Sequence, residues 1–203
     1  MIRIVNRLRR IRNLLRALRA TNSISWAWLL ERYSIDVLKW PCEPRDKGVY
    51  FSCLDMIIPR PCESVLLSGF PAAVKLHAGG LAFDASRETV HATAGTACVR
   101  VHNTEELQIL EEIYLDGMYH FRLNAPLLIL DIGMNVAYTT LYFAAMHPEA
   151  IVCGYEPLAP TFRCALANIA LNPRLQKQIR VHQFGLSDSD RTIDVTYCDK
   201  PVL

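Results

Sequence analysis

Two acidic residues, Asp131 and Glu156, follow strand-like apolar runs at a spacing suited to nucleotide binding. Asp131 ends the run 127–130 and is followed by Gly133 and Asn135. Glu156 ends a second apolar run and lies a little over twenty residues after Gly133. In nucleotide-binding βαβ units, an acidic residue at about this distance accepts hydrogen bonds from ribose hydroxyls. The spacing therefore predicts a ligand that contains a ribose.

Three elements are expected to position these residues. The apolar run 127–130 predicts a buried parallel strand, residues 139–146 predict a helix, and residues 151–155 predict a second strand. Turns at the carboxyl edge of such sheets bind cofactors. Backbone N–H groups of the turn and the positive end of the helix would face the ligand, so an anionic group is expected there. The alternative is that Asp131 merely caps the helix.

Four motifs, in order along the chain, resemble the FkbM-type S-adenosylmethionine-dependent methyltransferases. They are Asp131-Ile132-Gly133-Met134-Asn135, Tyr155-Glu156-Pro157, Phe162 with Asn168-Ile169-Ala170-Leu171-Asn172, and Gly185-Leu186-Ser187-Asp188. The likeness covers roughly residues 112–195. It implies an α/β fold with a partial Rossmann-like class I methyltransferase sheet, and S-adenosylmethionine as the cofactor.

The resemblance also implies roles for individual residues. Asp131 would complement the amino group of the methionine moiety, whose carboxylate would lie at the helix N-terminus. Gly133 would allow close backbone approach, Asn135 would bridge turn and ligand, and Glu156 would hold the ribose. Ser187 would lie near the adenine, although the stretch around it also fits an ordinary hairpin turn, which is the favoured interpretation.

The implied reaction is methyl transfer, with an oxygen of a small molecule or glycan favoured over a nitrogen as the acceptor. It is an in-line displacement, so the protein must align donor and acceptor, and a base is needed if a hydroxyl attacks. The catalytic base stays unknown, because His147 and His182 lie inside a predicted helix and a predicted strand. Isolated histidines elsewhere lack the spacing of metal ligands, so no metal is expected.

Two departures from the family keep alternatives open. Ala137 stands where the family usually has glycine, and a Cβ excludes conformations that glycine allows. The sequence also stops at Leu203, before the later strands and the Asp-x-Glu-Gly-type motif expected of such a domain. The alternative is therefore a catalytically incomplete remnant or fragment with weak or no cofactor binding. An NAD-binding oxidoreductase is less favoured, because the turn lacks the glycine pattern that accommodates a pyrophosphate.

Changes of pattern divide the chain into three expected segments. Segment 1–47 contains a basic helix over 1–20 and a second helix over 23–40, ended by Pro41 and a polar cluster. Segment 48–103 is expected to be β-rich, with short strands at 49–54, 65–67, 73–76, 81–83 and 97–101. Segment 104–203 is expected to be the N-terminal part of the methyltransferase domain, opening on a helix with Thr104 as its N-cap.

Residues 1–20 are amphipathic and rich in arginine. Apolar residues recur at three- and four-residue steps and no acid occurs among them, as in helices that lie on anionic membranes. Peripheral membrane contact is one expectation; a solvated helix packed on its own domain is equally compatible, and an organellar presequence ranks below both.

The overall composition restricts the remaining possibilities. The net charge is +2, but residues 1–20 hold seven arginines and no acid, so the rest of the chain is acidic by difference and no nucleic-acid partner is expected. The seven cysteines include no Cys-x-x-Cys pair and no secretory signal accompanies them. We therefore expect a cytoplasmic protein, with membrane association through residues 1–20 as an open possibility.

Overall fold

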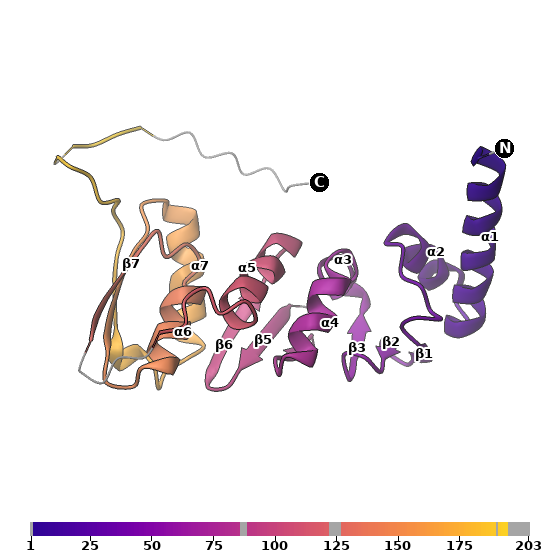
Figure 1. Cartoon of the computed structure of the whole chain (residues 1–203), viewed down its shortest axis with the longest axis horizontal. Coiled ribbons are helices and arrows are strands. Elements are labelled where there is room, and N and C mark those ends of the chain that lie inside the picture. Colours follow the sequence, from indigo (N-terminus) through magenta and orange to yellow (C-terminus); the bar gives the residue numbers. More distant parts are fainter. Residues whose placement is uncertain (1, 86–88, 122–126, 190, 195–203) are drawn as a thin grey trace. The chain divides into compact units, whose positions relative to one another are not determined.

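The computed structural model describes residues 2–85, 89–121, 127–189 and 191–194. The chain separates into two compact units, Met1–Met118 and Tyr119–Leu203. Both combine helices with small sheets, so the fold is mixed α/β (Figure 1). Among the described residues, no helix is both long enough and apolar enough to cross a bilayer.

The first unit begins with two packed helices, α1 (Ile2–Thr21) and α2 (Ile24–Arg32). Ser23 caps α2 by accepting a hydrogen bond from the Trp26 N–H. The helix ends earlier than expected, because Ser34 adopts a left-handed conformation and the N–H of Ile35 donates to the Leu30 carbonyl. This is the Schellman arrangement that terminates helices. The prediction of one helix over 23–40 was therefore wrong in its second half.

A three-stranded antiparallel sheet follows, made of β1 (Cys42–Arg45), β2 (Gly48–Phe51) and β3 (Met56–Pro59). Part of the polar cluster that follows Pro41 forms β1, and the residues after it form the turn to β2. Pro44 lies opposite Val49 on this edge strand. An edge position tolerates proline, because its missing N–H is not needed by a second neighbour.

Two of the predicted strands, at 65–67 and 73–76, are helical. After the short η1 (Arg60–Cys62) come α3 (Glu63–Ser68) and α4 (Phe70–Ala78), with Pro71 in the first turn of α4. Leu66, Phe70 and Ala73 are fully buried at helical spacing. The Phe70 ring packs 4.9 Å from that of Phe51, centroid to centroid. Short apolar runs do not distinguish helix from strand, and here packing selects the helix.

The rest of the first unit is an antiparallel meander and one helix. The meander contains β4 (Ala82–Asp84), β5 (Val90–Ala94) and β6 (Ala97–Val101). Helix α5 (Thr104–Tyr114) packs on α4, so it belongs to this unit and not to the second. Its N-cap is Asn103, not Thr104, because the Asn103 side chain accepts the Glu106 N–H at 2.9 Å. Glu106 reaches back to the His102 N–H, as in a capping box shifted by one residue.

The second unit has a parallel sheet of three strands, β7 (Leu128–Ile132), β8 (Ile151–Tyr155) and β9 (Ile179–His182), in chain order. Helix α6 (Tyr138–Met146) connects β7 to β8, and α7 (Ala159–Ala170) followed by η2 (Gln176–Gln178) connects β8 to β9. Figure 1 shows α6 and α7 on the same side of this sheet. The strand expected at 127–130, the helix at 139–146 and the strand at 151–155 correspond to β7, α6 and β8, whose bounds differ from the predictions by no more than two residues.

The two faces of this sheet differ in burial. Val152 and Gly154 point to the helices and are buried. On the other face, Leu128 and Ile132 of β7 are 68% and 64% exposed, and Leu130 between them is also exposed. Within the described residues, β7 pairs with β8 alone and is an edge strand.

Candidate cofactor-binding site

The turn between β7 and α6 presents alternate residues to solvent. Gly133 and Asn135 are exposed, whereas Met134 and Val136, the residues that follow each of them, are buried. Gly133 and Asn135 both have positive φ, at 77° and 52°. A Cβ at Gly133 would meet nothing within 4 Å, so the space above this residue is open to a ligand, as the role predicted for Gly133 requires.

Backbone hydrogen bonds fasten the turn to the second strand. The N–H groups of Gly133 and Met134 both donate to the carbonyl of Tyr155, at 2.9 and 3.0 Å. These two N–H groups are used within the fold, so the expectation that the whole turn offers its N–H groups to the ligand needs correction. The same bonds bring the turn against the residue that immediately precedes Glu156.

The Met134 side chain also holds the turn against β8, a contact that the sequence analysis did not predict. A Cβ built on Gly154 would lie 2.4 Å from Met134 Sδ and 3.2 Å from Thr140 Oγ1. Glycine at position 154 of β8 therefore makes room for Met134 and for the first turn of α6. The pair Cys153-Gly154 just before Tyr155-Glu156 was the available signal for this close approach.

Asp131 bonds to the beginning of α6. Its Oδ2 accepts hydrogen bonds from the Thr139 and Thr140 hydroxyls, at 2.7 and 2.6 Å. The alternative that Asp131 merely caps this helix is wrong, because the N-cap is Ala137 and no side chain in the described part of the chain bonds to the backbone N–H groups there; Asp131 bonds to two hydroxyls of the first turn instead. Charge and position still allow Asp131 to attract a cation, because it stays half-buried at the end of the strand.

Glu156 is a buried carboxylate at the end of β8. It is 6% exposed, and its Oε1 accepts the Leu158 N–H at 2.9 Å. Its own N–H donates to the His182 carbonyl of β9 at 3.1 Å. A buried carboxylate is costly unless hydrogen bonds satisfy it, so additional donors from a ligand would stabilise it.

Ser187 lies in a different setting from the other four predicted residues. It is exposed, in a stretch without regular structure after β9, and its hydroxyl donates to Asp188 Oδ1 at 3.1 Å. The fold joins Asp131, Gly133 and Glu156 through the turn and β8, and Asn135 lies in that turn. Ser187 is positioned by its own local bonds.

Three rings form a cluster at the ends of β8 and β9, which the sequence did not predict. Tyr155 and His182 are paired in the ladder and stack at 5.1 Å between centroids. Phe184 contacts both rings, at 5.4 and 5.7 Å. Tyr155 and His182 alternate with the helix-facing Gly154 and Val181, so this cluster belongs to the face that α6 and α7 leave uncovered.

In the ranges that the structure describes, no cluster of three or more His, Cys, Asp or Glu side chains could hold a metal ion. A cavity of about 660 Å³ lies in the first unit and takes its lining from α1, α2 and the residues just after them.

The candidate site therefore lies in a mixed α/β unit. It combines a glycine-containing turn after β7 with a buried carboxylate after β8, the neighbouring parallel strand. Comparison with curated proteins finds similarity to the AMB antimetabolite synthetase AmbE of Pseudomonas aeruginosa, at 34% identity over 110 residues. That match covers 53% of this chain and 5% of the synthetase. No family model and no solved structure matches the chain.

Proposed function

We propose that the second unit binds S-adenosylmethionine and serves methyl transfer to an oxygen of a small molecule or glycan. The observation that carries the proposal is the joining of the Gly133 turn to Glu156 through the Tyr155 carbonyl. These hydrogen bonds hold an open glycine turn beside a buried carboxylate. Such a pair can bind the sugar and the charged end of a nucleoside cofactor.

The electrostatics of this site suit the amino-acid part of this cofactor. Helix α6 has no acidic residue in its first turn, and no side chain caps its N-terminus. The positive end of its dipole favours a carboxylate. Asp131, held by two hydroxyls beside that helix end, would attract the ammonium group.

The sheet arrangement supports the same class of fold. Strands β7, β8 and β9 are parallel, adjacent in chain order, and crossed by helices on one face. One half of a Rossmann-like sheet has this order, and it binds ligands beyond the carboxyl ends of its strands. The similarity to a part of an antimetabolite synthetase supports a role in biosynthesis.

The turn disfavours NAD as the ligand. A dinucleotide turn uses three glycines so that the pyrophosphate can approach the backbone. Counted from Gly133, the second and third glycine positions of that pattern hold Asn135 and Tyr138, and Tyr138 is a large buried side chain. We propose no catalytic base on the acceptor side.

A scaffold role without turnover is the second candidate, and one observation favours it. The outer edge of β7 and the apolar side chains Leu128, Leu130 and Ile132 are exposed. Native sheets usually cover or charge such an edge. A cofactor site beside such an uncovered face of the sheet would bind its ligand weakly.

Calorimetric titration of the full chain with S-adenosylhomocysteine, with NAD as a parallel ligand, tests the proposal. The test variant is Glu156→Gln, which keeps an acceptor for the Leu158 N–H, and the control is the exposed Glu149→Gln. Hydrogen bonds to a charged group contribute about 1.5–3 kcal/mol, so Glu156→Gln should weaken binding roughly tenfold to 150-fold. The control should bind like the parent.

Each outcome decides between the candidates. Binding of S-adenosylhomocysteine that weakens in Glu156→Gln alone supports the cofactor and leaves the acceptor to be found. If the folded chain binds neither ligand, the enzyme proposal is dropped in favour of the scaffold. Preferential binding of NAD would overturn the choice of cofactor.

A further inference from the structure

Two rows of side chains run along α1 at the same spacing. The arginine row is Arg9, Arg12, Arg16 and Arg19, at steps of three, four and three residues. An apolar row precedes it by one residue throughout, with Leu8, Ile11, Leu15 and Leu18. Residues three and four apart share a helix face, so the two rows lie side by side along the helix.

The packing of α1 on α2 leaves Ile11 and Leu15 of the apolar row in water. Over residues 9–21, where burial is described, Ala17 and Thr21 are buried, and each is 2% exposed. Arg10 bonds to Glu31 of α2, with 2.6 Å between Arg10 Nε and Glu31 Oε1. Ile11 and Leu15 remain 48% and 52% exposed. The helix thus packs on its own unit through one face and leaves a second, apolar face in water.

The charge beside the apolar row is positive and lacks balancing acids on the helix. No aspartate or glutamate occurs in α1. The arginine-lined cavity of the first unit includes Arg9, Arg12 and Arg16 in its wall, with Arg32 from α2, and its acids are Glu31 and Asp36. Glu31 is already paired with Arg10.

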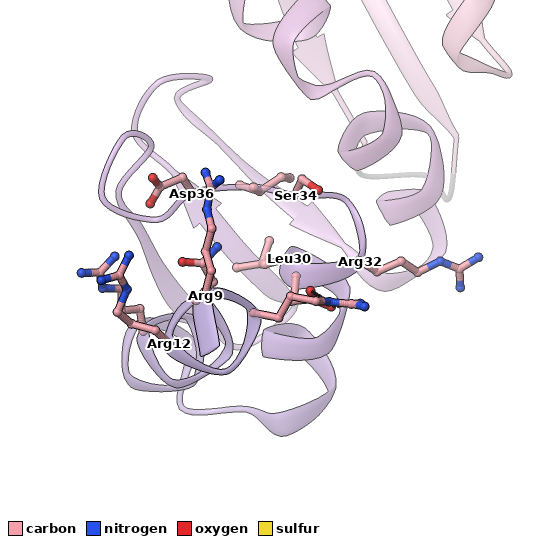
Figure 2. A pocket seen from close by; sticks show the side chains of 11 residues that line it. Arg9, Arg12, Leu30, Arg32, Ser34 and Asp36 are labelled. Carbon is pink, nitrogen blue, oxygen red and sulfur yellow. Dashed lines mark hydrogen bonds and ion pairs between the residues drawn. The ribbon is translucent and has the colours of Figure 1, made fainter. Parts of the chain in front are cut away.

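The guanidinium groups around this cavity are spread out. Figure 2 shows Arg12 and Arg32 pointing to opposite sides of the cavity, while the Arg9 side chain extends toward Asp36. Such a distribution does not enclose one small anion. It suits an extended surface that carries many negative charges.

We propose that α1 is a docking surface for an anionic phospholipid bilayer. Ile11 and Leu15 enter the boundary between headgroups and acyl chains, and the arginine row pairs with lipid phosphates. An apolar stripe bordered by arginines is the pattern of helices that lie in a membrane interface. The long arginine side chains reach the phosphates while their stems cover apolar surface.

Nucleic acid fits the same surface less well. Single-stranded nucleic acid is held by a basic groove together with aromatic side chains that stack on the bases. Helix α1 contains no aromatic residue, and its exposed apolar side chains are aliphatic. Binding to phosphates alone would leave Ile11 and Leu15 without a role.

Vesicle flotation of the full chain tests the proposal, using phosphatidylcholine alone and phosphatidylcholine mixed with phosphatidylglycerol. One variant replaces the arginines (Arg12→Gln, Arg16→Gln, Arg19→Gln) and one replaces the apolar pair (Ile11→Gln, Leu15→Gln). The control removes three exposed cations elsewhere in the unit (Lys39→Gln, Arg45→Gln, Lys47→Gln). All these positions lie at the protein surface or near it, and circular dichroism verifies folding.

The parent should float with the anionic vesicles and much less with the neutral ones. Each basic residue near an anionic surface strengthens binding about fivefold, so the triple arginine variant should partition about 100-fold less. The apolar pair should lose roughly tenfold, because half-exposed side chains lose their burial in the bilayer. The control should bind nearly as well as the parent.

Three results would overturn the proposal. The first is equal partition onto neutral and anionic vesicles, and the second is an equal loss in the control and in the triple arginine variant. The third is binding to single-stranded RNA that exceeds binding to vesicles and is indifferent to Ile11 and Leu15, which would assign the surface to nucleic acid. None of these results depends on the cofactor proposed for the second unit.

Discussion

The Asn168 side chain of α7 donates a hydrogen bond to the Val136 carbonyl at 2.8 Å. Asn168 is 1% exposed, and Val136 belongs to the turn that carries Gly133 and Asn135. Helix α7, the second crossover helix, therefore holds the turn that precedes α6, the first crossover helix. Asn172 supports the arrangement, because its side chain donates to the Asn168 carbonyl.

Asn168→Ala should loosen this turn. The change removes the donor and leaves the buried Val136 carbonyl without that partner, at a cost of about 1–3 kcal/mol. Hydrogen-exchange mass spectrometry should show faster exchange in peptides covering 133–141. The exposed Leu166→Ala on the same helix should leave those peptides unchanged. Equal exchange in parent and Asn168→Ala would show that the hydrogen bond does not hold the turn.

Ala137 should tolerate glycine and reject valine. Its φ of 69° lies in the left-handed region, where an L-residue costs about 1–2 kcal/mol. Glycine relieves that strain. Against this, the loss of a buried methyl group costs about 0.8 kcal/mol of stability, and the greater entropy of the unfolded chain costs about 0.4–1 kcal/mol more. Ala137→Gly should thus stay within about 1 kcal/mol of the parent.

Ala137→Val adds two methyl groups at a fully buried site in a conformation that β-branched residues avoid. Overpacking alone costs about 1–3 kcal/mol, so this variant should be less stable than Ala137→Gly by about 2 kcal/mol or more. Urea unfolding followed by circular dichroism compares the two. A valine variant as stable as the glycine variant would contradict the left-handed assignment.

The ion pair between Arg10 and Glu31 should make the docking of α1 on α2 sensitive to acid. The hydrogen bond from Arg10 lowers the pKa of Glu31 below its ordinary value of 4.5. A carboxylate with a depressed folded-state pKa stabilises the fold above its unfolded value, and the contribution is lost as pH falls through the folded value. Glu31→Gln should therefore melt below the parent at neutral pH, and this difference should shrink below about pH 4.5.

Tryptophan fluorescence is the suitable readout for that comparison. All three tryptophans, Trp26, Trp28 and Trp40, lie in the first unit, so the signal reports this unit alone. The exposed Glu43→Gln serves as the control. A constant difference between Glu31→Gln and the parent at all pH values would argue against the ion pair.

Cys42 should react slowly with alkylating reagents while the chain is folded. Burial, followed by the neighbouring Cys53, raises the pKa of the Cys42 thiol to about 11 from its ordinary 9.0. The thiolate fraction at pH 8 then falls about 100-fold, and the higher nucleophilicity of the more basic thiolate offsets part of this. Peptide mapping after iodoacetamide should show roughly tenfold slower labelling of Cys42 than in denatured chain. Equal rates would show that the site is open to solvent.

Much of the second unit could be predicted from sequence. Strands β7 and β8 contain apolar runs that end at Asp131 and at Glu156, and Gly133 marks the turn after β7. These signals are local, because a strand between helix-forming segments has few other ways to bury its side chains. Asp131, Gly133 and Glu156 could be placed near one another from topology alone.

The errors in the first unit arose where the local signal was ambiguous. Leu66 and Ala73 lie in short apolar runs that fit a buried strand or a buried helix equally well, and burial against neighbours such as Phe51 decided for helix. Strand β1 contains Pro44 and charged residues, so its composition does not indicate a strand. It forms a strand because it pairs with β2.

The sequence by itself determined the succession of strand, turn, helix and strand over residues 127–155 and the amphipathic pattern of the first helix, because each depends on residues close together in the chain. The tertiary structure alone decided which face of α1 packs and which stays in water. It also showed that Met134 lies over Gly154 and that Asn168 holds Val136. Such contacts join residues far apart in the chain, and no periodicity of the sequence encodes a distance between them.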